Sequence, residues 1–154
     1  GAYPPKLGSI VKGDKEDGEK IIEVFFKNVP GLQELIEEVR YEFTSNHGLL
    51  RTIDGGYVRC PSLNAALNYR IQSMGAIVMK VSAILLHEKL IEKGLWNMKT
   101  GDIHDEGQHE TDRKSGEELG QAAVQAIKDA GETLNLNVKT GGDYKVGTNW
   151  SQTH

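Results

Sequence analysis

The sequence predicts an α+β fold in which long helices pack on a small antiparallel sheet. Several segments repeat apolar residues at intervals of three and four, the spacing that places them on one helical face. Between these segments lie short stretches around glycine-containing turns, a pattern typical of β-hairpins. A length of 154 residues is enough for one compact domain.

Two helices are expected in the N-terminal third, after a loop that covers roughly the first dozen residues. Asp14 is a suitable N-cap for the first helix. The apolar stripe of that helix consists of Ile21, Ile22, Phe25 and Phe26. Pro30 ends the pattern. The second helix then has these apolar residues on one face: Leu32, Leu35, Ile36, Val39 and Phe43.

A hairpin and a long helix are expected next. Asp54-Gly55-Gly56 predicts the hairpin turn, because glycine readily adopts the positive φ that such turns require. The helix is expected from about Ser62 to Lys93, with Gly94 as the residue that ends it. Its predicted inward face consists of Leu67, Ile71, Met74, Val78, Val81 and Leu85.

The C-terminal part is expected to be extended, then helical, then extended. Residues 101–111 are polar and surround the acidic turn His104-Asp105-Glu106. Ser115 and Glu118 have the spacing of a capping box at the start of a helix. The small face of that helix consists of Leu119, Ala122, Ala123, Ala126, Ile127 and Ala130. Alternating apolar residues then predict a strand, at Leu134, Leu136 and Val138.

Composition limits the classes of function. The net charge of −4 argues mildly against a stand-alone nucleic-acid-binding domain, which is usually basic. Cys60 is the only cysteine, which excludes an internal disulfide and a cysteine-rich zinc site and suits a reducing cytoplasm. The longest apolar run, residues 77–91, contains charged side chains, so we expect no membrane span. The first residues have no signal-peptide pattern.

The acidic turn is the most informative feature. Adjacent carboxylates point to opposite faces of a strand, but a tight turn between strands brings both near one cation. Magnesium is typically held by one or two carboxylates together with phosphate oxygens and water. Asp105 and Glu106 are therefore candidate magnesium ligands, with His104 beside them. On chemistry alone, such a sequence more often forms an ordinary exposed polar turn.

Two other kinds of metal site are weaker alternatives. A zinc-protease site requires two histidines four residues apart on a helix, whereas His104 and His109 are five apart with Gly107 between them. An adventitious metal cluster would use six side chains: Asp102, His104, Asp105, Glu106, His109 and Glu110.

A stripe of amides on the long helix is the second candidate site. Asn64, Asn68 and Gln72 are spaced four residues apart and lie on one face. Amide donors suit the minor groove, where every base pair presents an acceptor. Basic side chains that could contact phosphates are Arg51, Arg59, Arg70 and Lys80. The alternative is an ordinary polar stripe that faces solvent.

An ordered set of segments resembles family A DNA polymerases, particularly the replicative polymerases of podovirus-type phages. Gly1-Ala2 resembles the end of the Tyr-Gly-Ala sequence that closes the fingers helix, and KNVPGLQEL at residues 27–35 resembles the helix pair that follows. Residues 58–61, 65–68 and 71–76 resemble the family's "VRSPHAALN…QSAGA". IHDE at residues 103–106 resembles "VHDE", the third polymerase motif, and residues 147–154 resemble the terminal "NW…H".

The resemblance implies an architecture and a set of roles. Residues 1–154 would form the C-terminal part of the polymerase domain, with fingers-side helices and a hairpin in 1–61 and palm in 62–154. Asp105 would bind the catalytic magnesium ions, Glu106 would support the metal and primer terminus, and His104 would lie beside the primer strand. Asn68 and Gln72 fall on positions that contact the minor groove of the primer–template.

The implied reaction is attack of a primer 3′-hydroxyl on the α-phosphate of a dNTP, in a two-metal site. The implied partners are primer–template DNA, dNTP and an N-terminal polymerase portion that supplies the other catalytic Asp and the fingers Lys and Arg. The implied location is the cytoplasm of a bacterial or phage-infected cell.

One departure from the family concerns the acidic turn. About half a dozen residues that relatives have ahead of His104 are missing, which predicts a shortened arm of the catalytic hairpin. The alternative function is therefore a non-catalytic relic that keeps the fold and binds duplex DNA weakly.

Overall fold

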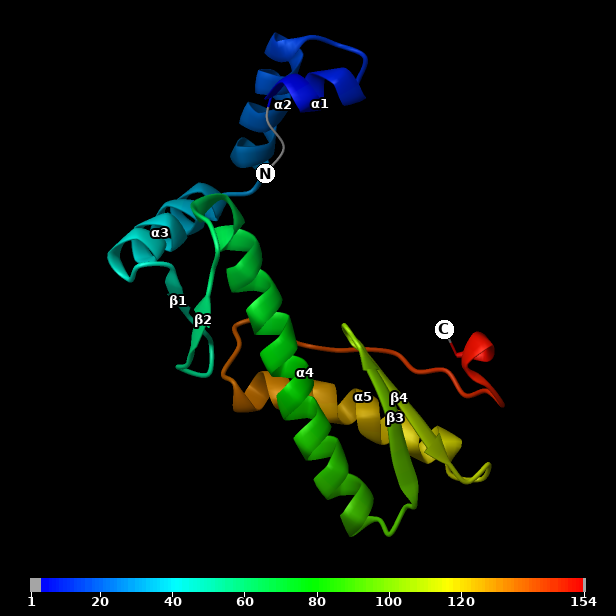
Figure 1. Cartoon of the computed structure of the whole chain (residues 1–154). Helices are drawn as coiled ribbons and strands as arrows, with labels where there is room; N and C mark the ends of the chain where they lie inside the picture. Colours follow the sequence, from blue (N-terminus) through cyan, green and yellow to red (C-terminus); the bar gives the residue numbers. More distant parts are fainter. Residues whose placement is uncertain (1–3, 154) are drawn as a thin grey trace. The chain divides into compact units, whose positions relative to one another are not determined.

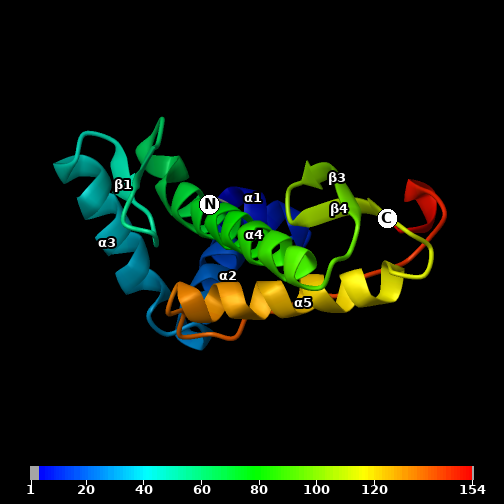
Figure 2. The ribbon, with the colours of Figure 1, turned by 90° about the horizontal axis from the view of Figure 1, so that it is seen from below.

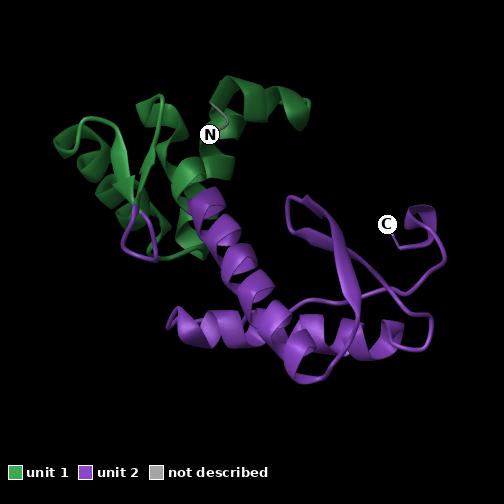
Figure 3. Cartoon of the chain, turned by 60° about the horizontal axis from the view of Figure 1, so that its bottom comes forward, with its two compact units in different colours: residues 1–51, 57–70 green, residues 52–56, 71–154 purple. Residues whose placement is uncertain are grey.

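The computed structural model describes residues 4–153 and has the expected α+β class, with helices and two separate two-stranded antiparallel sheets (Figure 1). The chain divides into two compact units (Figure 3). The first contains residues 1–51 and 57–70, and the second contains residues 52–56 and 71–154. The boundary falls inside the long helix α4, Ala66–Glu92.

The first unit begins with two helices, α1 (Pro4–Ile10) and α2 (Lys15–Asn28). The loop expected over the first dozen residues is therefore wrong. Proline is tolerated in the first helical turn, where its missing amide proton has no helical partner. Gly18 allows α1 and α2 to pack closely, because a Cβ on this residue would lie 1.9 Å from the Pro4 carbonyl oxygen.

Asp14 caps α2 as predicted. Its Oδ1 accepts a hydrogen bond of 3.1 Å from the Asp17 amide, and Asp17 Oδ2 accepts one of 3.2 Å from the Asp14 amide. Helix α3 (Leu32–Ser45) follows after Gly31, whose φ is +83°. The helix boundary at Pro30 is thus confirmed.

The hairpin predicted around Asp54-Gly55-Gly56 consists of β1 (Leu49–Arg51) and β2 (Tyr57–Arg59). Gly55 has a φ of +86°, as the turn requires. A small core joins α3, this hairpin and the start of α4. Its buried members are Val39, Leu50, Cys60 and Ala66.

Glu42 on α3 connects three elements of the first unit. Its Oε1 accepts a hydrogen bond of 2.5 Å from the Arg51 amide on β1. Its Oε2 forms an ion pair with the guanidinium of Arg70 on α4. The Arg70 and Glu42 side chains are only 19% and 17% exposed, so the pair is largely removed from solvent.

Helix α4 follows a 3₁₀ turn at Leu63–Ala65 and ends where predicted. Gly94 has a φ of +63°, and the Leu95 amide donates to the Leu90 carbonyl at 2.9 Å. The predicted inward face is confirmed only in part. Its members other than Ile71 are half-buried, and Leu85 packs against the core, but Ile71 is 53% exposed and the fully buried residues of the C-terminal half are Ser82, Leu86 and Leu90. No helix within residues 4–153 is long and apolar enough to cross a membrane.

In the second unit, α5 (Gly116–Thr133) packs across the C-terminal half of α4 (Figures 1 and 2). The buried contact consists of Leu86, Leu90, Leu119, Ala122 and Ala126, which confirms the predicted small-residue face of α5. Two ion pairs, each of 2.8 Å, border it: Lys89 with Asp129, and Lys93 with Glu118. The predicted capping box is wrong, because the Ser115 side chain makes no capping hydrogen bond and Glu118 binds Lys93.

The C-terminal tail is not the predicted strand, and Val138 is 71% exposed. Instead, tail side chains lie directly against glycines of α5. A Cβ on Gly120 would be 2.1 Å from the Tyr144 ring, and one on Gly116 would be 2.8 Å from Val146. The Tyr144 hydroxyl donates to Glu117 at 2.8 Å. The tail then ends in the 3₁₀ turn η2 (Trp150–Gln152).

Replacement of Gly120 by alanine is expected to lower the free energy of unfolding by about 1 kcal/mol or more, because the tail must move. Gly75→Ala is the matched control. It lies in a helix with nothing within 4 Å of an added Cβ, so alanine should stabilise it by about 0.5–1 kcal/mol. Urea unfolding of both variants tests this, and equal shifts would contradict the packing described for Tyr144.

Glu42→Ala is expected to destabilise the chain by roughly 2–4 kcal/mol, because it leaves the Arg70 guanidinium buried without its carboxylate. The double replacement Glu42→Met with Arg70→Leu should recover most of that loss, since no charge then remains uncompensated. Thermal unfolding of the single and double variants measures the difference. If the stability losses of the single variants simply add in the double variant, the interaction between Glu42 and Arg70 contributes nothing to stability.

Candidate functional site

The acidic turn lies at the tip of a β-hairpin in the second unit. The hairpin consists of β3 (Asn97–Ile103) and β4 (Glu106–Thr111). Ile103 and Glu106 form the last pair, so His104 and Asp105 are the two residues of the turn. His104 has a φ of +55°, a left-handed conformation that is uncommon outside glycine. The predicted extended structure around the turn is confirmed, and it begins earlier than residue 101.

The hairpin is paired up to the turn, and its shortening relative to the family that the sequence resembles stays a prediction. Strand β3 has seven residues and β4 has six, and their pairing continues to the turn. Lys99 pairs with His109 and Gly101 pairs with Gln108, which leaves Thr100 as a bulge. A bulge changes which face the following residues present and is frequent beside active sites. Any difference in length from relatives therefore leaves a complete hairpin that supports Asp105.

The predicted metal ligands have different surroundings. His104 and Asp105 are exposed, whereas Glu106 is half-buried. Glu106 Oε1 accepts a hydrogen bond from the Gln108 side-chain amide. Asp102 binds Lys99 at 2.6 Å and so already has a cationic partner. Sequence reasoning missed Gln108, although its spacing of two residues from Glu106 on one strand face would have indicated the contact.

The adjacent carboxylates of Asp105 and Glu106 give the hairpin two sets of hard oxygen donors. Within residues 4–153, no group of three or more His, Cys, Asp or Glu side chains is arranged to hold a metal ion. The six-residue cluster considered as an alternative is therefore not formed. Two carboxylates fit a magnesium ion whose remaining ligands are phosphate oxygens and water. The donor set is thus suited to part of a magnesium site.

His109 lies on β4, where it pairs with Lys99, and is half-buried. Its Nδ1 is buried and makes no hydrogen bond. Burial lowers the pKa of His109 below 6.5, the charge of Lys99 lowers it further, and Asp102 opposes the change. The lowered pKa favours a neutral imidazole at His109.

The amide stripe lies on the surface. Asn64 is in the 3₁₀ turn before α4, Asn68 and Gln72 are in α4, and all three are exposed. Exposure of these amides agrees with contact to a DNA minor groove and equally with an ordinary polar stripe, so it does not distinguish the two. Arg59 on β2 is also exposed, whereas Arg70 is paired with Glu42.

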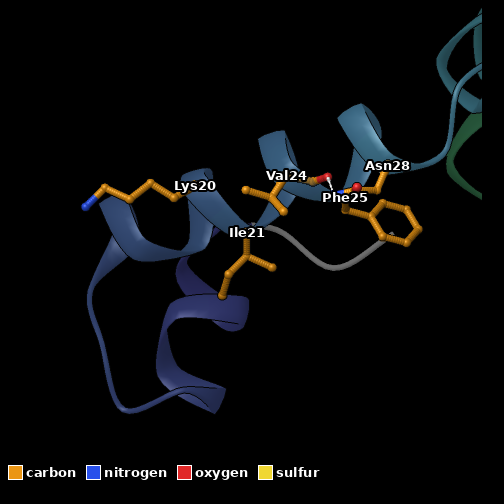
Figure 4. Close-up of a pocket in the computed structure, with 5 residues that line it drawn as sticks. All are labelled: Lys20, Ile21, Val24, Phe25 and Asn28. Carbon is orange, nitrogen blue, oxygen red and sulfur yellow. Dashed lines mark hydrogen bonds between the residues drawn. The ribbon is translucent and has the colours of Figure 1, made fainter.

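An apolar hollow of about 480 Å³ lies on α2 (Figure 4). Its lining consists of Lys20, Ile21, Val24, Phe25 and Asn28. The Asn28 side-chain amide donates to the Val24 carbonyl at 2.7 Å. The lining contains no carboxylate or imidazole.

Comparisons with known proteins concern nearly the whole chain. The model of the family "DNA polymerase family A" matches residues 1–152. The DNA-directed DNA polymerase of Escherichia phage Phieco32 is 30% identical over all of this chain and 26% of its own length. That of Escherichia phage T7 is 29% identical over all of this chain and 25% of its own length. DNA polymerase I of Aquifex aeolicus is 26% identical over 96% of this chain and 26% of its own length.

The fold is also similar to a solved structure, the POL domain of Pol1 from M. smegmatis in complex with DNA primer-template and dNTP. The TM-score is 0.75 at 23% sequence identity, over 84% of this chain and 25% of that one. The chain therefore spans about a quarter of the length of the relatives that it matches. Two segments of the resemblance, Gly1-Ala2 and His154, lie outside the described residues.

His109→Gln is expected to reduce the pH dependence of stability. The unfolded chain binds a proton at this histidine near pH 6.5, whereas the folded chain binds it only at lower pH. Protonation therefore favours unfolding, and stability should fall as the pH decreases below about 6.5. Melting temperatures between about pH 5 and pH 7.5 measure this. An equal pH dependence in the variant would contradict the lowered pKa of His109.

Proposed function

This chain belongs to DNA polymerase family A, and we propose that it forms the C-terminal part of a DNA-directed DNA polymerase. The family match over residues 1–152 is the observation that carries the proposal. The hairpin that presents the acidic turn supports it. In this proposal residues 1–61 belong to the fingers side, and residues 62–154 belong to the palm.

Asp105 is the proposed ligand of the catalytic magnesium, and Glu106 supports the metal and the primer terminus. Bound magnesium would stabilise the charge on the attacking and leaving oxygens of phosphoryl transfer. The reaction is attack of a primer 3′-hydroxyl on the α-phosphate of a dNTP, which forms a phosphodiester bond, breaks the bond between the α- and β-phosphates and releases pyrophosphate. Asp105, in the exposed turn, can reach a metal shared with the triphosphate. His104 in the same turn lies beside the primer strand.

The remaining ligands come from another part of the polymerase. The described residues contain two adjacent carboxylates at the turn and no larger metal-binding group. A two-metal site needs further acidic ligands, and the triphosphate needs basic partners. We assign these to an N-terminal polymerase portion, in the same longer chain or in a separate one. The proposed setting is the cytoplasm of a bacterial or phage-infected cell.

The amide stripe is the proposed contact with primer–template DNA. Asn68 and Gln72 present exposed donors four residues apart on one side of α4, and Asn64 is exposed in the 3₁₀ turn before the helix. Acceptors at purine N3 and pyrimidine O2 occur in every base pair, so such contacts detect pairing without reading sequence. Arg59 is the proposed phosphate contact.

Asp105→Asn is expected to abolish most primer extension by the polymerase that contains this chain. Loss of a metal ligand removes several kcal/mol of transition-state stabilisation. At about 1.4 kcal/mol for each factor of ten, the rate should fall roughly 10²- to 10⁴-fold. Asp102→Asn is the matched control, because Asp102 lies in the same hairpin but binds Lys99. Single-nucleotide incorporation with saturating dNTP measures both.

Equal rates for the Asp105→Asn and wild-type enzymes would eliminate the proposed role of the turn. If the complete polymerase binds duplex DNA but incorporates no nucleotide at any magnesium concentration, the non-catalytic alternative holds. Gel-shift binding of primer–template by the same preparations distinguishes these outcomes.

A further inference from the structure

Gln108 connects the acidic turn to the C-terminal tail. It lies two residues after Glu106 on β4, so both side chains leave the same face of the strand. Its Nε2 donates to Glu106 Oε1. Its Oε1 lies 3.4 Å from the hydroxyl of Thr153, which follows η2 at the end of the tail. One amide thus contacts a proposed metal-site carboxylate and a segment 45 residues later.

The chemistry of the three groups determines the direction of this amide. An ionised carboxylate only accepts hydrogen bonds, so the amide nitrogen must face Glu106. The amide oxygen then faces Thr153, which is a hydroxyl donor. The Thr153 hydroxyl also lies 3.1 Å from the Trp150 carbonyl, so its single proton is shared between two acceptors. The contact to Glu106 is therefore the stronger half of the connection.

The tail reaches this position because it is attached along α5. Tyr144 and Val146 lie against Gly120 and Gly116, and the Tyr144 hydroxyl binds Glu117. Within the final turn, the Gln152 side-chain oxygen accepts from the Thr148 amide at 2.7 Å. These contacts define where Thr153 lies relative to β4 in the second unit.

We propose that Gln108 is a positioning residue that holds the Glu106 carboxylate for metal binding, and that the docked tail supports it through Thr153. This inference rests on the proposed function, because it concerns the same carboxylates. Without the amide, the half-buried Glu106 carboxylate loses this hydrogen bond and is less restricted in orientation. Partners of metal ligands that act in this way typically change metal affinity by roughly 10- to 100-fold.

The test measures Mn²⁺ binding by electron paramagnetic resonance in the polymerase that contains this chain, without DNA or dNTP. Gln108→Ala is expected to weaken binding roughly tenfold. Gln125→Ala is the matched control, because Gln125 donates in the same way to Asp129, on α5, at 2.7 Å. Primer extension should show the same shift, as a higher magnesium requirement with the maximal rate largely retained at saturating magnesium.

A second pair of variants tests the contribution of the tail. Thr153→Val removes the hydroxyl and should weaken Mn²⁺ binding by a smaller factor, whereas Thr153→Ser keeps the hydroxyl and should restore wild-type binding. If Gln108→Ala does not fold, this pair alone decides the inference. Wild-type Mn²⁺ affinity in Gln108→Ala, or equal affinities of the two Thr153 variants, would overturn it.

Asp105→Asn separates this inference from the proposed function. If Asp105→Asn loses Mn²⁺ binding while Gln108→Ala retains it, the metal site stands and the positioning role of Gln108 fails. If Asp105→Asn also binds Mn²⁺ normally, the proposed function fails and the positioning role fails with it.

Discussion

The packing of α4 against α5 is the contact on which the second unit depends. Leu86 and Leu90 meet the small face of α5, where Ala122 and Ala126 allow close approach of the helices. Strands β3 and β4 lie in the connection between these helices, so the packing brings the start of β3 and the end of β4 to the same pair of helix ends. The Thr111 hydroxyl closes the base of the hairpin by donating to the Trp96 carbonyl at 2.6 Å. The acidic turn lies at the end of the hairpin opposite to this contact.

Small residues on the other side of α5 have a second consequence. Gly116 and Gly120 lack the Cβ atoms that would displace Val146 and Tyr144. The helix therefore has two packed sides, one against α4 and one against the tail. This arrangement explains why a segment with no regular strand is nevertheless held close to β4.

Much of the fold could be predicted, because several boundaries depend on local chemistry. The cap at Asp14, the positive φ of Gly55 and the helix end at Gly94 all follow from one residue and its neighbours. The buried face of α4 could not be predicted, because the helix is apolar around most of its circumference and tertiary contacts determine which face is buried. The capping box at Ser115 was also wrong because of a tertiary contact, since Glu118 is bound to Lys93. The bulge at Thr100 interrupts the alternation by which β3 would have been recognised.

The candidate site shows the same division between local and distant causes. Adjacent acidic residues and a turn are visible in the sequence, and the hairpin presents Asp105 in its turn. The environment of Glu106 depends on Gln108 and, through it, on Thr153, which no local pattern indicates. The chain corresponds to about a quarter of its relatives' length and presents two adjacent carboxylates at the turn. In the proposed polymerase the other ligands come from another portion, so the orientation of each carboxylate would matter, because within residues 4–153 no group of three or more His, Cys, Asp or Glu side chains is arranged to hold a metal ion.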